Sequence, residues 1–258
     1  MAEFTDQLNR KIFLDSTPRT IISLVPSQTE LLSDLGLDEE VTGITKFCVH
    51  PTQWFQSKTR IGGTKNLDLE KIFSLQPDLV IANKEENLKE QVEEIAAHVP
   101  VWVSDVNNLQ DAVTMIRSIG AITGKTEKAA EIASGISTGF KILQLKPIKA
   151  CYLIWQEPFM TVGGDTFIHA MMKHAGLVNV FDKHNRYPEV SIEAIRDSGA
   201  ELLLLSSEPY PFKQSHADHL KTLIPGMKVI LVDGEMFSWY GSRLLQAPAY
   251  FKQLRDYL

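Results

Sequence analysis

Hydrophobic positions along this chain form short aliphatic runs that alternate with stretches of helical periodicity. The runs that predict strands are 20–26, 41–45, 79–82, 101–104, 149–154, 202–205 and 229–232. Aliphatic runs of this length are typical of strands buried on both faces, and amphipathic helices between them indicate βα units. The alternation therefore predicts an α/β fold with mostly parallel sheets covered by helices.

Two stretches of the chain repeat one pattern. Residues 68–82, DLEKIFSLQPDLVIA, align with residues 191–205, SIEAIRDSGAELLLL, at an offset of 123 positions (191 − 68). Further pairs follow in the same order: 20–26 with 150–156, TELLSDLGL with TFIHAMMKHAGL, and 100–106 with 229–235. A period this long indicates duplicated lobes rather than a solenoid. We expect two similar parallel-sheet lobes with a ligand cleft between them, because small molecules commonly bind at domain interfaces.

The segments around the strands carry their own signals. Residues 3–5 and 11–14 predict a two-stranded ribbon. Ser27 and Glu30 have capping-box spacing and Gly36 provides a stop, so we expect a helix over 28–35. The aromatic segment 46–63 predicts a long loop, and loops of this length are usually functional.

The middle of the chain predicts a connection between the lobes. From Thr126 to about Leu145 nothing interrupts a helix, and about 20 residues span roughly 30 Å. Such a long helix would be a rigid backbone that permits only a small closure. The domain organisation is therefore predicted as an N-terminal lobe over 1–107, interlobe helices over 108–147, and a C-terminal lobe over 148–258.

Composition excludes several classes of protein. The 258 residues are 44% hydrophobic, enough for one large core or two smaller ones. A net charge of −6 without clusters of Lys and Arg argues against nucleic acid as a partner. Two cysteines, Cys48 and Cys151, exclude a disulfide framework, and we expect two buried free thiols.

The N-terminal residues carry charges and lack the apolar run of a secretory signal. No window approaches the roughly 18 apolar residues of a membrane span, so direct membrane insertion is not expected. The chain as written therefore predicts a cytoplasmic protein, unless a signal was removed, and we expect a monomer.

Motifs for catalysis are absent or incomplete. The segment TGKT at 123–126 has Ile119 where a phosphate loop needs glycine, so we interpret it as an interhelical turn. There is no GxSxG at a strand-to-helix turn, and no HExxH or CxxC sequence. Cys48 precedes His50 by two positions, but such positions point apart in an extended loop. No enzymatic activity is therefore predicted, and no catalytic residue is assigned.

Aromatic side chains concentrate just beyond the carboxyl ends of predicted strands. The candidates for ligand binding are Phe47, His50, Trp54, Trp155, Phe159, Phe237, Trp239, Tyr240 and Arg243. Tyr187, Tyr210 and Phe212 occupy similar positions. Open parallel sheets bind ligands at this edge, and flat apolar faces suit a bulky, planar or conjugated ligand. The candidates for a metal site gathered from distant loops are His50, His169, Asp233 and Glu235.

The order of several segments resembles one family. They are RTIISLVPSQTELLSDLGL, RIGGTKNLDLEKIFSLQPDLVIANKEEN, VWVSDV, LIW, GGDTFIHAMMKHAGLVNVF and DGEMFSWYGSR. Together they resemble the helical-backbone substrate-binding proteins of ABC importers, and most of all the cobalamin-binding branch. The resemblance runs from about Arg19 to Leu254. It implies two α/β lobes bridged by a rigid helix, and a cleft that holds cobalamin, haem, an iron siderophore or a bare metal. It also implies docking to an ABC permease in the periplasm or another extracytoplasmic compartment.

The resemblance also implies roles for particular residues. Cleft-lining segments fall on 47–54, 155–160 and 237–243. The acidic residues that would meet the permease are Glu85, Glu86, Glu90, Glu189 and Glu193. The chain departs from the family pattern with Thr64 in place of a tryptophan, His50 in place of a tyrosine and Lys89 in place of an acid.

These observations lead to one hypothesis and two alternatives. The first is non-enzymatic binding of a corrinoid such as cobalamin, or a related metal-containing cofactor, for ABC-type import. One alternative is a siderophore, haem or transition-metal receptor of the same fold. The other is an intracellular enzyme or cofactor chaperone on this fold, because fold does not fix function.

Overall fold

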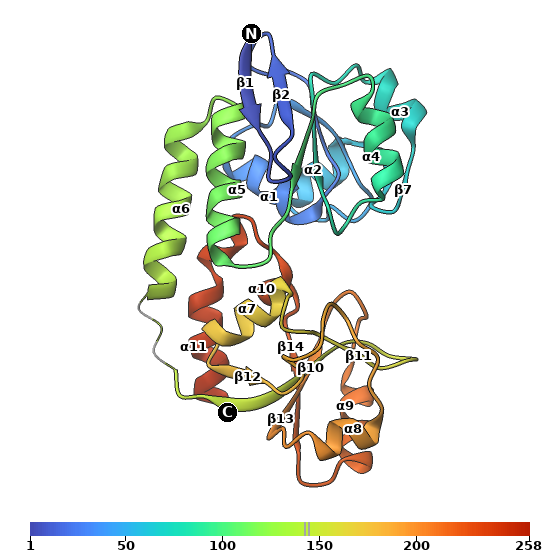
Figure 1. Cartoon of the computed structure of the whole chain (residues 1–258), viewed down its shortest axis with the longest axis vertical. Helices are drawn as coiled ribbons and strands as arrows, with labels where there is room; N and C mark the ends of the chain where they lie inside the picture. The colour runs from blue at the N-terminus through green and yellow to red at the C-terminus, as the bar shows by residue number, and fades with distance from the viewer. Residues whose placement is uncertain (142, 144) are drawn as a thin grey trace. The chain divides into compact units, whose positions relative to one another are not determined.

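The computed structural model describes residues 1–141, 143 and 145–258. These residues form two compact units, each with its own sheet (Figure 1). The first unit comprises Met1–Val106, Gln110–Ser137 and Tyr240–Arg243, and the second comprises Asn107–Leu109, Thr138–Trp239 and Leu244–Leu258.

The first unit contains a five-stranded sheet in the order β5-β4-β3-β8-β9. Its strands are β3 (Ile21–Ser23), β4 (Val41–Ile44), β5 (Thr59–Arg60), β8 (Leu79–Asn83) and β9 (Val101–Ser104). Every neighbouring pair is parallel. All residues of β3, β8 and β9 are buried, as expected for aliphatic strands covered on both faces.

Helices and a small hairpin connect these strands. The elements are α1 (Pro26–Asp34), α2 (Thr52–Ser57), α3 (Leu69–Ser74), α4 (Lys89–Ala96), α5 (Leu109–Ile122), β6 (Gly62–Gly63) and β7 (Asn66–Leu67). The capping box predicted at Ser27 is wrong, because α1 begins at Pro26 and its N-cap Val25 makes no side-chain hydrogen bond. Proline suits the first helical position, where its missing N–H would have no partner. The predicted loop 46–63 is also more ordered than expected, since it contains α2 and β5.

The predicted N-terminal ribbon is confirmed as β1 (Ala2–Thr5) paired antiparallel with β2 (Lys11–Leu14). The turn of this ribbon lies on the outer edge of β9. There Gln7 N donates to Val103 O at 3.1 Å, and Arg10 Nη2 donates to Val101 O at 3.1 Å. The ribbon therefore covers an edge strand that would otherwise expose unpaired backbone groups.

The second unit also has a five-stranded sheet. Its strands are β10 (Ile148–Trp155), β11 (Met160–Thr161), β12 (Leu177–Asn179), β13 (Leu202–Ser206) and β14 (Lys228–Val232). β10, β13 and β14 lie side by side in parallel. β12 pairs with β10 in parallel, and β11 pairs with β10 antiparallel. Its helical elements are α7 (Phe167–His174), α8 (Ile192–Asp197), α9 (Gln214–Leu223), α10 (Glu235–Ser238), the 3-10 helix η1 (Ser242–Leu245) and α11 (Ala247–Tyr257).

The internal repeat predicted from the sequence is confirmed by the topology. The strand order β4-β3-β8-β9 of the first sheet corresponds to β12-β10-β13-β14 in the second. α8 begins 123 residues after α3 (192 − 69) and β13 begins 123 residues after β8 (202 − 79), which is the offset of the sequence repeat. The fold is therefore α/β with two similar, mostly parallel sheets, as expected.

The predicted backbone helix corresponds to α6 (Thr126–Lys141), and the division between the two units falls within it. Sixteen residues give a length of about 24 Å. Leu143 and Leu145 belong to no helix, and positions 142 and 144 of the predicted helix lie outside the described residues. Across the described ranges, no helix is both long and apolar enough to cross a membrane.

Candidate functional site

Aromatic side chains lie together at the carboxyl ends of β10 and β13 in the second unit. Trp155, the last residue of β10, is 40% exposed, and its ring centroid lies 5.5 Å from that of Tyr210 in an edge-on arrangement. Tyr210 in turn packs on Phe212 and His216 at centroid distances of 4.7 Å and 5.5 Å. We call Trp155, Tyr210, Phe212 and His216 the aromatic cluster. In it Trp155 stays partly exposed and packs edge-on against Tyr210.

The support under Trp155 is held by backbone and core contacts. Tyr210 N donates to Ile154 O at 3.3 Å, which ties the loop after β13 to the end of β10. Phe212 is buried in the core of the unit, and Phe159 packs partly buried against the same core. His216 Nδ1 accepts a hydrogen bond from Lys213 N at 2.8 Å at the start of α9. An aromatic face held in this way is preorganised for stacking.

A half-buried carboxyl group, that of Glu208, follows the end of β13 two residues before Tyr210. Glu208 Oε1 accepts hydrogen bonds from Trp239 Nε1 at 3.0 Å and from Ser238 Oγ. Burial raises the pKa of Glu208, and the charges of Glu235 and Asp233 raise it further, while the hydrogen bond from Ser238 opposes them. Trp239 is only 6% exposed. Its indole is therefore a structural contact of Glu208 rather than an open ligand face.

Two more predicted ligand residues lie in the interior. Trp54, 2% exposed, sits on α2 and donates from Nε1 to Asp38 Oδ1 at 2.7 Å. Phe237 is fully buried, with ring centroids 5.1 Å from Tyr152 and 4.8 Å from Phe251. The expectation that these two rings face a ligand is corrected, because core packing already occupies them.

Tyr240 and Arg243 belong to the first unit, although they lie near the end of the chain. Tyr240 Oη donates to Glu86 Oε1. Arg243 donates from Nε and Nη2 to the two carboxylate oxygens of Glu30 at 2.8 Å and 2.6 Å. Both side chains are buried and engaged within the protein, so their predicted role in ligand contact is corrected to one of anchoring.

The close approach of this segment requires a glycine. A Cβ at Gly241 would lie 2.3 Å from Ser27 O, a distance no side chain tolerates. The backbone therefore packs directly on the start of α1. Sequence analysis missed this arrangement, because no local pattern links Arg243 to Glu30, 213 positions away.

In the first unit, two predicted ligand residues stay accessible. Phe47 is 51% exposed, and Lys46 Nζ lies 5.1 Å from the centroid of its ring. His50 is half-buried at the start of the segment that leads into α2. Both follow the carboxyl end of β4, where a parallel sheet offers a ligand surface.

The predicted metal ligands are not brought together. Within residues 1–141, 143 and 145–258, no three His, Cys, Asp or Glu side chains gather in a way that could hold a metal ion. His50 belongs to the first unit, whereas His169, Asp233 and Glu235 belong to the second. Asp233 Oδ1 instead accepts a hydrogen bond from Glu235 N at 3.1 Å.

The two cysteines are buried and free, as predicted. Burial raises the pKa of the Cys48 thiol, which hydrogen bonds with Thr29 and Thr45 only partly offset. Burial raises the pKa of Cys151 to about 12. Neither thiol forms the thiolate that nucleophilic chemistry requires at neutral pH.

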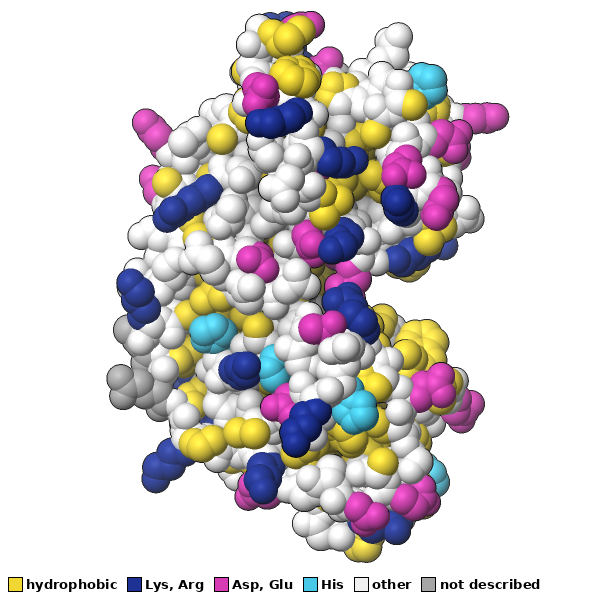
Figure 2. All heavy atoms as spheres, viewed as in Figure 1, with side chains coloured by type: hydrophobic (Ala, Val, Ile, Leu, Met, Phe, Trp, Pro, Cys, Tyr) yellow, Lys and Arg dark blue, Asp and Glu magenta, His cyan; other side chains and the backbone are white. Residues whose placement is uncertain are grey.

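The acidic residues predicted to meet a permease differ in their surroundings. Glu90, Glu189 and Glu193 are exposed, whereas Glu85 is half-buried and Glu86 is bonded by Tyr240. Figure 2 shows Lys and Arg side chains interspersed with Asp and Glu side chains over the visible face. That face is therefore a mixed surface rather than a single-sign field.

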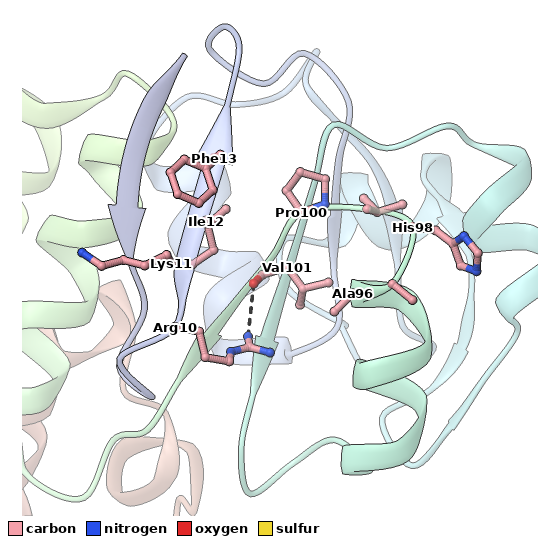
Figure 3. A pocket seen from close by; sticks show the side chains of 10 residues that line it. Arg10, Lys11, Ile12, Phe13, Ala96, His98, Pro100 and Val101 are labelled. Carbon is pink, nitrogen blue, oxygen red and sulfur yellow. Dashed lines mark hydrogen bonds between the residues drawn. The ribbon is translucent and has the colours of Figure 1, made fainter.

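One pocket of the first unit lies between β2 and the connection from α4 to β9 (Figure 3). Its volume is about 400 Å³, and Arg10, Ile12, His98 and Val101 contribute to its walls. The guanidinium of Arg10 is used within the fold, by Asp6 and by Val101 O. This pocket therefore reflects how the ribbon is attached to β9.

Comparison with known proteins identifies relatives of this fold. The family model described as periplasmic binding protein matches residues 21–224. The vitamin B12-binding protein of Vibrio campbellii is 26% identical over 201 residues, 75% of this chain and 73% of that protein. An uncharacterized ABC transporter substrate-binding lipoprotein of Bacillus subtilis is 27% identical over 204 residues, 74% of this chain and 64% of that protein. The solved structure of the periplasmic heme-binding protein RhuT from Roseiflexus sp. RS-1 has a TM-score of 0.79 at 22% identity, covering 92% of this chain and 98% of that one.

Proposed function

We propose that this chain, which belongs to the periplasmic binding protein family, binds a corrinoid such as cobalamin, or a related metal-containing cofactor, for import by an ABC permease. Membership of a family of binding proteins confirms the expectation that the chain is not an enzyme. The enzyme alternative is therefore set aside.

The aromatic cluster carries this proposal. Trp155 is partly exposed and packs against Tyr210 at the strand ends of the second sheet. Stacking on such a face suits a large, conjugated macrocycle with few charges. The vitamin B12-binding relative supports a corrinoid as that ligand.

As candidates for ligand contact we propose Trp155 and Phe159 in the second unit and Phe47 and His50 in the first, each unit taken by itself. These residues keep accessible surface, unlike Trp54, Phe237 and Trp239. His50 would pack on the macrocycle or approach its metal, since imidazole is a common ligand of transition metals.

The partner is proposed to be an ABC permease, with the protein acting outside the cytoplasm. The substrate-binding lipoprotein of Bacillus subtilis supports both statements. Exposed Glu90, Glu189 and Glu193 are the residues proposed to meet cationic side chains of the permease. Surface pairs of this kind contribute about 0 to 1 kcal/mol each and act mainly on orientation and association rate.

A haem is the second candidate ligand, supported by the likeness to a heme-binding protein. Porphyrin and corrin rings are both flat, so the aromatic cluster could stack on either. Haem would need an axial ligand from the protein. In the aromatic cluster, His216 does not suit this role, because its Nδ1 accepts from Lys213 N.

The test is a titration of the purified protein with cyanocobalamin, cobinamide and haem, followed by tryptophan fluorescence and checked by equilibrium dialysis. Saturable one-to-one binding of a corrinoid at micromolar or lower concentration, about −8 kcal/mol, supports the proposal. Cobinamide lacks the lower nucleotide of cobalamin, so equal affinities would place recognition on the corrin ring. Binding of haem alone would replace the corrinoid with the second candidate.

A further inference from the structure

The aromatic cluster contains a histidine, the residue type whose charge changes between about pH 5 and 8. The ring of His216 lies at centroid distances of 5.5 Å from Tyr210 and 5.7 Å from Phe212, so it packs on both. Tyr210 contacts both His216 and Trp155, with a centroid distance of 5.5 Å to each. A change at His216 therefore reaches Trp155 through a single side chain.

His216 also holds the start of α9. The N-cap of this helix is Lys213, whose side chain has no acceptor for the N–H groups of the first turn. Most N-caps are Ser, Thr, Asp or Asn, which do have one. Here the third helical residue reaches back instead, and His216 Nδ1 accepts from Lys213 N at 2.8 Å. This is the reverse half of a capping box, a place that glutamate or glutamine normally takes.

The bond to Lys213 fixes the protonation state that this arrangement needs. A backbone N–H can only donate, so Nδ1 of His216 must carry a lone pair. The proton of the neutral ring is then on Nε2, which lies 3.5 Å from Tyr210 Oη. A second proton on the ring would turn Nδ1 into a donor that faces the N–H of Lys213, and the hydrogen bond would be lost.

Within the described part of the chain, no carboxylate forms an ion pair with the ring of His216. Asp218, two positions along α9, pairs with Lys221 at 3.3 Å. Glu208, in the loop before α9, accepts from Trp239 Nε1 at 3.0 Å. An imidazolium would therefore gain no ion pair to offset the lost bond. The titratable and charged groups on the elements around the ring are Glu157, Glu208, Tyr210, Lys213, Asp218, His219 and Lys221.

We propose that neutral His216 positions the aromatic cluster for its ligand, and that protonation of His216 weakens ligand binding. This rests on the proposed function, since it concerns the same cluster. Protonation breaks the bond at the start of α9 and loosens the segment that carries Tyr210, so Trp155 loses the ring against which it packs. Ligand and proton then oppose each other, and each weakens the binding of the other by the same factor. A ligand held at neutral pH is released as the pH falls.

The test compares wild type with His216→Gln from about pH 7.5 to about pH 5.5, the range in which histidine titrates. Glutamine suits the third position of a capping box, so its Oε1 should accept from Lys213 N without gaining a proton. His219→Gln is the matched control, since His219 lies three positions further along α9 and is exposed. Circular dichroism verifies the folding of each variant.

Equilibrium dialysis with cobinamide measures the affinity at each pH. We expect the Kd of wild type and of His219→Gln to rise about fivefold or more towards the lower pH, the effect of one lost hydrogen bond. The Kd of His216→Gln should change less than about twofold over the same range, because its amide does not titrate. A weaker affinity of this variant at neutral pH would report lost ring packing and leaves the pH profile as the deciding readout.

A second measurement needs no ligand. The chain has four tryptophans, and the indole N–H signal of Trp155 in a ¹⁵N correlation spectrum can be assigned by its loss in Trp155→Phe. We expect this signal to move between the two pH values in wild type and to keep its place in His216→Gln.

Two results would overturn the proposal. One is a change of Kd with pH that is equal in wild type and His216→Gln, which would place the titrating group elsewhere. The other is a Trp155 signal that moves in both proteins or in neither. A lack of cobinamide binding at neutral pH would count against the proposed function alone, and the Trp155 signal would still decide the role of His216.

Discussion

Replacing Trp155 with alanine removes the exposed face of the aromatic cluster and leaves its support in place. The indole is 40% exposed, and a whole tryptophan presents about 250 Å². A stacked ligand would therefore cover about 100 Å², which corresponds to about 2.5 kcal/mol at 25 cal/mol per Å². In the variant, neighbouring side chains would still cover part of the ligand surface that Trp155 contacts. We therefore expect a loss in binding free energy of about 1.4 to 2.5 kcal/mol, roughly tenfold to seventyfold in Kd.

The assay is equilibrium dialysis with cobinamide, because Trp155→Ala also removes a fluorophore and would bias a fluorescence titration. Trp155→Phe is the matched variant, since it keeps an aromatic face and should recover most of the affinity. Thermal unfolding should change little in either variant, given that Trp155 lies at the surface. Unchanged affinity in Trp155→Ala would refute the assignment of the aromatic cluster to the ligand.

Further predictions concern contacts inside each unit. Arg243→Met should lower the free energy of unfolding of the first unit by about 3 kcal/mol in urea, because it leaves the almost buried carboxylate of Glu30 unpaired. The double variant Arg243→Met with Glu30→Gln should recover part of this loss. Glu208→Gln should raise Tm at pH 7 and have little effect near pH 4. The pKa of Glu208 is raised in the folded state, so the ionised carboxyl group is less favourable there than in the unfolded chain. This penalty on stability grows as the pH rises above the pKa of the unfolded state, and the glutamine removes it. An equal shift at both pH values would contradict that reasoning. Ellman's reagent should react with neither Cys48 nor Cys151 until urea unfolds the protein, whereas prompt native-state labelling would mean that a thiol is reached without unfolding.

The regular elements could be predicted because their signals are local. Aliphatic runs located the main strands, and the repeat predicted that the two halves share one pattern at one offset, whereas the order of strands within each sheet came from the structure. The segment around α2 was not predicted, because a helix of six residues has too few turns to show periodicity. Trp54 was consequently assigned to a ligand surface, although its helix turns it into the core.

The candidate site was harder to predict because it depends on contacts between distant positions. The sequence located Trp155, Tyr210 and Phe212 after strand ends, where the structure brings the three together. It gave the same weight to Trp239, since position after a strand does not reveal that an indole N–H is bonded to the carboxyl of Glu208. Which aromatic rings remain exposed is decided by tertiary packing, and only the structure shows it.

Because Tyr240–Arg243 belongs to the first unit, that unit receives its last segment late in synthesis. When the first 137 residues have been translated, nearly all of the first unit is present. The partners of Glu86 and Glu30, which are Tyr240 and Arg243, are then still more than a hundred codons away. Until they arrive, those carboxylates and the start of α1 remain open to water and to chaperones. The first unit can therefore form early but can be completed only when the second has almost been translated, so folding of the first unit depends on synthesis of the second.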